Sequence, residues 1–142
     1  MSLGNTFEND LAKLIFNGTA IANIADNAAS SPLTSLYVSL HTADPGEAGN
    51  QTTSECAYTS YARVAVARNS GGWTVTNNVV TPTANIDFPA CTGGTETATY
   101  WCVGTASSST GKILGSGALS PSISISTGVT PRVTTASTIT WD

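Results

Sequence analysis

Two segments of alternating side chains, separated by a long polar segment, constrain the fold of this chain more than any other feature. Residues 36–41 place Leu, Val and Leu at every second position, and residues 61–66 place Ala, Val and Val in the same way. This period of two is typical of a strand with one buried face. Residues 42–60 lie between them and contain the turn signal Asp44-Pro45-Gly46 and almost no large aliphatic side chain. We therefore expect two strands joined by a long loop.

Alternating segments and turn signals continue to the end of the chain. Strands are expected at residues 73–76, 79–88, 95–105, 112–119, 122–126 and 132–141. Pro82 interrupts the second of these strands and confines that point to an edge or a bulge. About eight strands at this spacing indicate a mainly β fold, and two antiparallel sheets of four strands in a jelly-roll-like β-sandwich fit the number.

The start of the chain has the pattern of a short α-helix over residues 5–17. Asn5 and Glu8 have the spacing of a capping box, and Gly18 supplies the residue that ends a helix. The side chains expected on the packed face of this helix are Phe7, Leu11, Leu14 and Ile15. Residues 19–31 predict an irregular segment or a second short helix. At 142 residues the chain is expected to form a single domain, 1–142, whose sandwich body spans 36–142.

Composition argues against two classes of partner. Charged residues make up 10% of the chain, against about 25% in an average domain, and the net charge is -4. The five basic residues are scattered, so we expect no nucleic-acid binding. No apolar stretch approaches a membrane span and the start lacks the pattern of a secretory signal, so we expect no membrane contact and synthesis in a cytoplasm.

Three cysteines, Cys56, Cys91 and Cys102, have no metal-binding or redox-motif spacing. Without a secretory signal, reduced thiols are the expected state. A pair formed by Cys91 and Cys102 across neighbouring strands stays open as an alternative.

The sequence offers little chemistry, and no enzyme is expected. His41 is the one histidine, and Ser39 and Asp44 beside it could be imagined as a triad. Three residues at one strand end rarely meet that geometry, so a histidine hydrogen-bonded to the loop is the expected role. Asp44, Glu47 and Glu55 form a loose acidic group without the dense pattern of a calcium site. We therefore expect no metal, no cofactor and no catalytic residue.

The long loop 42–60 is the expected contact surface, because it is long and poor in core residues. Truncation or charge reversal there is expected to weaken partner binding and to leave the fold intact. The three tryptophans are expected in the core, with a sugar-stacking platform as the alternative. The candidate partner contacts are Asp44, Glu47, Asn50, Glu55, Tyr58 and Tyr61.

Essentially the full length of the chain resembles a family of small structural proteins of tailed bacteriophages. The run NTFENDLAKLIFNGTAIANIADNAASSPLTSLYVSLHTADPGEAGNQTTSE carries the resemblance, with YARVAVAR and SGGWTV after it. Within that family the chain is most similar to the cement, or decoration, proteins on the heads of short-tailed phages, some relatives of which are labelled tail fibre proteins. The family has no catalytic motif, so no active residue is carried over.

The resemblance implies a virion protein made in the host bacterial cytoplasm. It would bind the outer surface of the head, on the lattice of the major capsid protein, and stabilise the shell. It also implies a homo-oligomer, with a dimer favoured. The alternative that the resemblance leaves open is a tail- or fibre-associated β-sandwich that binds host surface glycans.

Overall fold

The structure is a computed structural model, and it describes residues 5–21 and 32–141. The expected second helix or irregular segment at 19–31 lies mostly outside the described residues. In chain order the elements are α1 (Asn5–Asn17), β1 (Ser35–His41), β2 (Val64–Ala67), β3 (Trp73–Thr76), β4 (Val79–Pro82), β5 (Ile86–Asp87), β6 (Glu96–Gly104), β7 (Ile113–Ile125), β8 (Arg132–Val133) and β9 (Ile139–Thr140).

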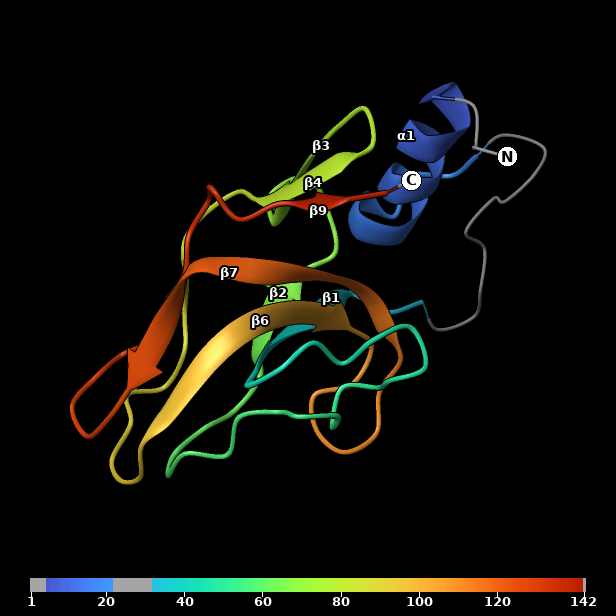
Figure 1. The fold of residues 1–142 in the computed structure, drawn as a ribbon. Helices are drawn as coiled ribbons and strands as arrows, with labels where there is room; N and C mark the ends of the chain where they lie inside the picture. Colours follow the sequence, from blue (N-terminus) through green and yellow to red (C-terminus); the bar gives the residue numbers. More distant parts are fainter. Residues whose placement is uncertain (1–4, 22–31, 142) are drawn as a thin grey trace.

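The strands of the described chain form three antiparallel sheets. The largest has the order β2-β1-β6-β7, and the smaller ones are β3-β4-β9 and β5-β8. Figure 1 shows the long strands β6 and β7 side by side, with the β3-β4-β9 sheet between β7 and α1. The expectation of a mainly β, antiparallel sandwich with one short helix is confirmed. The strands are divided into sheets of four, three and two, and not into the two sheets of four that the count of strands had led us to expect.

One apolar core joins the sheets. Its members come from the large sheet, from both small sheets and from α1. Trp73 and Trp101 are fully buried and Trp141 packs against the same cluster from a half-buried position, so the expected core placement of the tryptophans is confirmed. The thiols of Cys56, Cys91 and Cys102 are buried and unpaired, so the alternative of a Cys91–Cys102 disulfide is not found.

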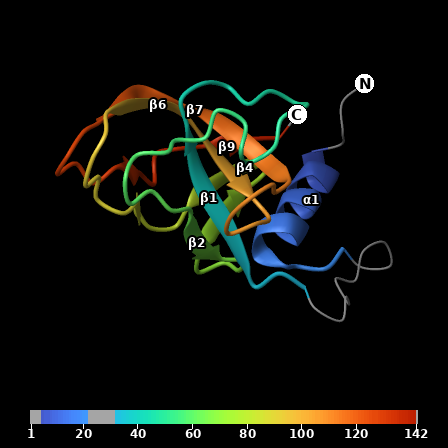
Figure 2. The ribbon, with the colours of Figure 1, turned by 90° about the horizontal axis from the view of Figure 1, so that it is seen from below.

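β1 and β6 are the centre of the large sheet, and Figure 2 shows β1 between β2 and β6. Leu40 lies opposite Trp101, and Val38 lies opposite Val103. These side chains are fully buried, which explains the strong alternation in both segments. Cys102 points to the other face of β6 and is also fully buried, so both faces of this strand are covered at its centre.

β7 is one long strand where two were expected. The pairing of β6 with β7 is interrupted by a large bulge. Four residues of β7, 119–122, stand opposite a single residue of β6, Thr99. Pro121 lies inside this bulge, where a missing N–H costs no ladder bond. The break expected between 119 and 122 is therefore a bulge within β7 and does not end the strand.

Two segments expected as single strands, 79–88 and 132–141, are each divided in two. β4 ends at Pro82 and β5 starts at Ile86, while β8 and β9 are separated by residues 134–138. The two segments still run antiparallel to each other, because β5 pairs with β8 and β4 pairs with β9. They form one antiparallel ribbon that breaks between the two small sheets.

The helix α1 has the expected bounds but buries a different face. Ala12 and Phe16 are fully buried, whereas Leu11, Leu14 and Ile15 are half-buried. The side chain of Phe7 lies outside the described set. Figure 1 shows α1 next to the β3-β4-β9 sheet. Two tryptophans determine the face, Trp73 in β3 and Trp141 just after β9: Phe16 makes edge-to-face contacts with them at 5.2 Å and 6.2 Å between ring centroids.

Arg68, just after β2, holds the carboxyl end of α1. Its Nε donates to the carbonyl of Ile15 at 2.5 Å, and its Nη2 donates to the carbonyl of Leu14 at 2.6 Å. The last carbonyls of a helix have no partner within the helix, and a cation there also interacts favourably with the helix dipole. Since α1 has no basic residue in its own last turn, Arg68 provides this stabilisation from outside the helix.

Candidate functional site

The loop between β1 and β2 is closed at its base by backbone bonds. The N–H of Thr42 donates to the carbonyl of Ser54 at 2.8 Å, and the N–H of Cys56 donates to the carbonyl of Leu40 at 2.9 Å. The loop therefore leaves the sheet and returns to the same place. Its two halves differ in burial, and we treat them separately as the outer half, 42–50, and the inner half, 51–61.

The outer half is mostly exposed. Asp44, Gly46 and Glu47 are exposed, and the Oδ1 atom of Asp44 accepts a bond from the N–H of Gly46 at 2.9 Å. This turn matches the predicted Asp44-Pro45-Gly46 signal, and the φ angle of 67° at Gly46 explains the glycine. Asn50 is half-buried, and its side-chain oxygen accepts bonds from the N–H and the hydroxyl of Thr52.

A groove of about 500 Å³ lies between the outer half of the loop and the start of β7. Asp44 and Glu47 line one side of it, and Lys112 and Ser116 line the other. The groove is therefore lined by both negative and positive side chains, and no described side chain fills it. Of the six candidate contacts, Asp44 and Glu47 are the two that the structure places on an open surface.

The inner half of the loop is part of the folded body. Gln51 is fully buried: its Nε2 donates to the carbonyl of Tyr37 at 3.3 Å, and its Oε1 accepts from the N–H of Ala106 at 3.0 Å. Its own N–H donates to the carbonyl of Gly111 at 2.9 Å. A Cβ atom on Gly104 or Gly111 would approach the amide of Gln51 to within about 2 Å, so both glycines are needed to make room for it.

Glu55 makes an ion pair and does not form an open contact. Its carboxylate accepts from Nε of Arg63 at 2.7 Å and from the hydroxyl of Tyr61 at 2.9 Å. The side chains of Arg63 and Glu55 are 3% and 16% exposed. Arg63 also donates to the carbonyls of Ala106 and Ser109, so this network joins the loop to the segment between β6 and β7. The hydrogen bond to Glu55 raises the pKa of the Arg63 guanidinium, and burial raises the pKa of the Tyr61 hydroxyl.

Tyr58 was expected as an exposed contact, and this prediction is wrong. Its side chain is 4% exposed, and its hydroxyl donates to the carbonyl of Pro89 at 2.8 Å. Burial raises the pKa of Tyr58 to about 12. The ring of Tyr61 is half-buried, packs edge-to-face on Tyr58 at 5.3 Å and stacks on Phe88 at 6.2 Å between ring centroids. The expectation that residues 42–60 lack core residues therefore fails for the inner half. Sequence reasoning missed this because the anchoring groups are polar or aromatic.

His41 is hydrogen-bonded to the loop, as expected. Its Nδ1 lies 2.8 Å from the carbonyl of Thr53, and its Nε2 lies 2.8 Å from the hydroxyl of Ser39. Ser39 and His41 are both fully buried, and burial lowers the pKa of His41. In a catalytic triad the Nδ1 atom of His41 would bond to the carboxylate of Asp44. Here it bonds to the carbonyl of Thr53 instead, and the carboxylate of Asp44 bonds within its own turn. The Ser39–His41 pair thus ties the loop to β1.

Two further features bear on the function. Within residues 5–21 and 32–141, no three His, Cys, Asp or Glu side chains come together in a way that could hold a metal ion. No helix in the same residues is long and apolar enough to cross a membrane.

Comparison with known families decides the class of protein. Residues 2–141 match the family described as podophage GP4 fiber I protein gp80. The chain belongs to this family. It is therefore a structural protein of a short-tailed phage, as the resemblance implied at the level of class. The same comparison names a fibre and not a capsid cement. A comparison with curated proteins gave no match.

Proposed function

We propose that this chain is a non-catalytic component of the fibre of a short-tailed phage, and that it acts by binding other virion proteins. The family match over residues 2–141 carries the proposal. The burial of Ser39 and His41 supports a non-catalytic role, because the one serine–histidine pair among the described residues is closed to substrate.

The outer half of the β1–β2 loop is the proposed contact surface for a neighbouring virion protein. Asp44 and Glu47 are exposed, and they line the groove opposite Lys112. Apart from the local turn at Asp44, their side chains make no hydrogen bond or ion pair with another residue of the part of the chain that the structure describes. A partner that places a basic or amide side chain between these carboxylates would be recognised by charge. The chain's low charge also reduces the desolvation cost of a wide protein contact.

Glycan binding receives less support from the surface. Stacking on sugars requires exposed flat rings, but Trp73 and Trp101 are fully buried and Tyr58 is 4% exposed. Among the described residues, Leu33 is the one large hydrophobic residue that is exposed, at 44% of its surface. We therefore propose a protein partner and not a host sugar as the ligand of this chain.

Capsid cementing is the second candidate function, and the low-charge surface favours it. A protein that binds only the assembled lattice of the major capsid protein stabilises that lattice by linkage. Many weak, symmetry-related contacts would act together, and a homo-oligomer would match a symmetry axis of the shell. This function would use the same outer half of the loop.

Locating and counting the protein in purified virions separates the two functions. We expect few copies, at the tail, when virions are labelled with an antibody against this chain and imaged by electron microscopy. A copy number that matches the head lattice would overturn the fibre assignment in favour of cementing, and absence from the virion would overturn both.

A pair of variants tests the proposed contact surface. Glu47→Lys is expected to reduce incorporation into virions by roughly fivefold, the effect of about 1 kcal/mol at an interface rim. Thr127→Lys places a lysine on another exposed turn, far from the groove in sequence, and serves as the matched control. Equal incorporation of the two variants would show that the outer half of the loop is not the contact.

A further inference from the structure

The large sheet ends at β2, and the outer edge of this strand has unpaired backbone groups. The N–H of Arg68 donates to the carbonyl of Thr34, which fixes the alternation of the β1–β2 ladder. Residues 64 and 66 therefore bond to β1, and the N–H and C=O groups of Ala65 and Ala67 point away from it. The carbonyl of Ala67 is covered by Gly72 in the following turn. The backbone groups of Ala65 have no partner among the described residues.

Two of the other strand edges in the described residues, those of β7 and β3, are protected in ways that the edge of β2 is not. β7, the opposite edge of the same sheet, has a wide bulge at 119–122 that contains Pro121. β3, at the edge of its own sheet, lies against α1. Bulges, prolines, charged side chains and covering helices are the devices by which proteins prevent strand addition. The sequence Val-Ala-Val-Ala of β2 contains none of them.

The two arginines that flank β2 already interact with other groups of the chain. Arg63 is 3% exposed in its ion pair with Glu55, and Arg68 donates to carbonyls at the end of α1. Neither guanidinium extends along the edge to repel an approaching strand. The side chain of Ala65 is exposed and small, so another backbone can come within hydrogen-bonding distance of it.

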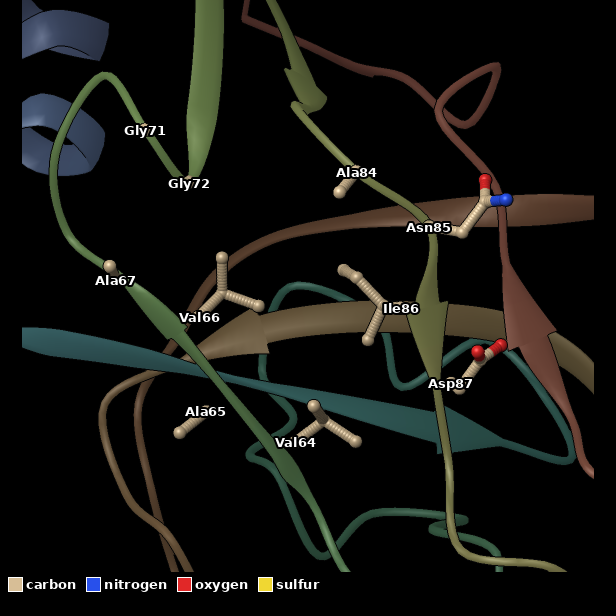
Figure 3. Close-up of a pocket in the computed structure, with 10 residues that line it drawn as sticks. All are labelled: Val64, Ala65, Val66, Ala67, Gly71, Gly72, Ala84, Asn85, Ile86 and Asp87. Atoms are coloured by element: carbon tan, nitrogen blue, oxygen red, sulfur yellow. The ribbon is translucent and has the colours of Figure 1, made fainter.

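A groove of about 300 Å³ opens beside this edge, between β2 and β5. Figure 3 shows the side chains of Val64 and Val66 on one side of the groove and that of Ile86 on the other, all pointing into the space between the strands. The valines are half-buried although they pack on the core. Asp87, the one charged residue of the groove, is paired with Arg132. A strand added to β2 would cover this apolar opening.

We propose that the edge of β2 pairs with β2 of a second copy of this chain, antiparallel and about a two-fold axis, with Ala65 opposite Ala65. In this register each Ala65 N–H donates to the Ala65 carbonyl of the other copy. Val64 then lies opposite Val66 of the second copy on the groove side, which gives two cross-strand valine pairs. The result is a continuous sheet of eight strands, four from each protomer.

The chemistry of the edge favours a second copy over an unrelated segment. The edge needs an extended strand with small side chains, no charge, and apolar groups at the two positions that face the groove. The strand Val64–Ala67 itself meets each of these conditions. The two-fold register also places Arg63 opposite Ala67 of the second copy, so no two arginines face each other.

This contact is small, so the dimer is expected to be weak in isolation. Stable interfaces bury roughly 1,200–2,000 Å², more than one four-residue strand pair provides. We expect dissociation constants between about 10 µM and 1 mM for the free protein. In a virion, other contacts would raise the effective concentration and make a weak pairing sufficient.

Charged substitutions of either sign at Ala65 test both the pairing of the β2 edge and its register. Sedimentation of the purified chain at rising concentration should show a monomer–dimer equilibrium. Ala65→Lys and Ala65→Glu should each weaken the dimer roughly tenfold or more, because the register places each charge opposite its own copy. An equimolar mixture of the two variants should restore association. Ala65→Ser, which keeps the backbone and adds no charge, is the matched control and should dimerise like the natural sequence.

Three results would overturn the proposal: a natural chain that stays monomeric at about 1 mM, a dimer that Ala65→Lys leaves unchanged, or charge variants that do not associate when mixed. Circular dichroism and thermal unfolding of each variant show whether it is folded, and the exposed position of Ala65 leads us to expect no change. The experiment uses the free protein, so its outcome does not depend on whether the fibre assignment holds.

Discussion

Replacing Gln51 by alanine is expected to destabilise the protein by about 2–5 kcal/mol. The substitution removes the two hydrogen bonds that the fully buried amide of Gln51 makes, and it leaves the N–H of Ala106 without its partner. Each unsatisfied buried group costs about 1–3 kcal/mol. The space that Gly104 and Gly111 leave for the amide would also become a cavity, which adds to the cost.

Urea unfolding followed by tryptophan fluorescence measures this effect. With a slope of about 2 kcal/mol per molar urea, a loss of 3 kcal/mol moves the midpoint down by about 1.5 M. Glu47→Ala is the matched control from the same loop, and its exposed side chain predicts a change within about 0.5 kcal/mol. If Gln51→Ala also changes stability by less than about 0.5 kcal/mol, the inner half of the loop is not part of the folded body and our division of the loop fails.

Four further predictions follow from individual side chains. Arg68→Ala should lower the free energy of unfolding by about 1–3 kcal/mol and lower helical ellipticity, because two carbonyls at the end of α1 lose a charged donor; unchanged ellipticity would contradict this. Burial raises the pKa of Cys56 and of Cys102 to about 12, so at pH 8 only about one thiol in ten thousand is ionised and a thiol reagent should modify them only after unfolding. The unfolded thiols ionise near pH 9, so stability should fall as the pH rises above that value. Burial lowers the pKa of His41, so the unfolded chain binds its proton first and stability should fall below about pH 6.5; His41→Gln should reduce this slope relative to the natural chain.

The sequence was informative where one physical cause dominates a segment. The alternation around Val38 and around Trp101 predicted the two central strands, because each has a neighbour on both sides and a buried face. The helix bounds were also predicted well. Its buried face was not, since that face depends on Trp73 and Trp141, which come from distant strands.

Segments with several competing causes were predicted less well. Two strands were expected at 112–119 and 122–126, and only the pairing with β6 shows that one strand continues between them through a bulge that contains Pro121. Val133 and Ile139 continue one alternation, but they belong to different sheets because the chain turns between them.

The candidate site was half predicted. Asp44 and Glu47 are exposed, as a polar loop implies, whereas Gln51 and Tyr58 are equally polar in sequence and are buried. A polar side chain becomes a core residue only when the fold supplies its hydrogen-bond partners, and those partners are backbone groups of remote segments. No local pattern in the sequence shows where those groups will lie.

Because the base of the β1–β2 loop is closed by hydrogen bonds, the tip of the loop should tolerate the insertion of a foreign peptide. The N–H and the hydroxyl of Thr42 both donate to the carbonyl of Ser54, so the segment between these two residues, which contains the rest of the outer half, is closed whatever its length. An insertion after Glu47 would add only loop-closure entropy, about 0.6 kcal/mol for each doubling of the loop length. The folded body would then tolerate short inserted sequences at a site that leaves Gln51 and the sheet untouched, and because this site is part of the proposed contact surface, such an insertion should reduce incorporation into virions.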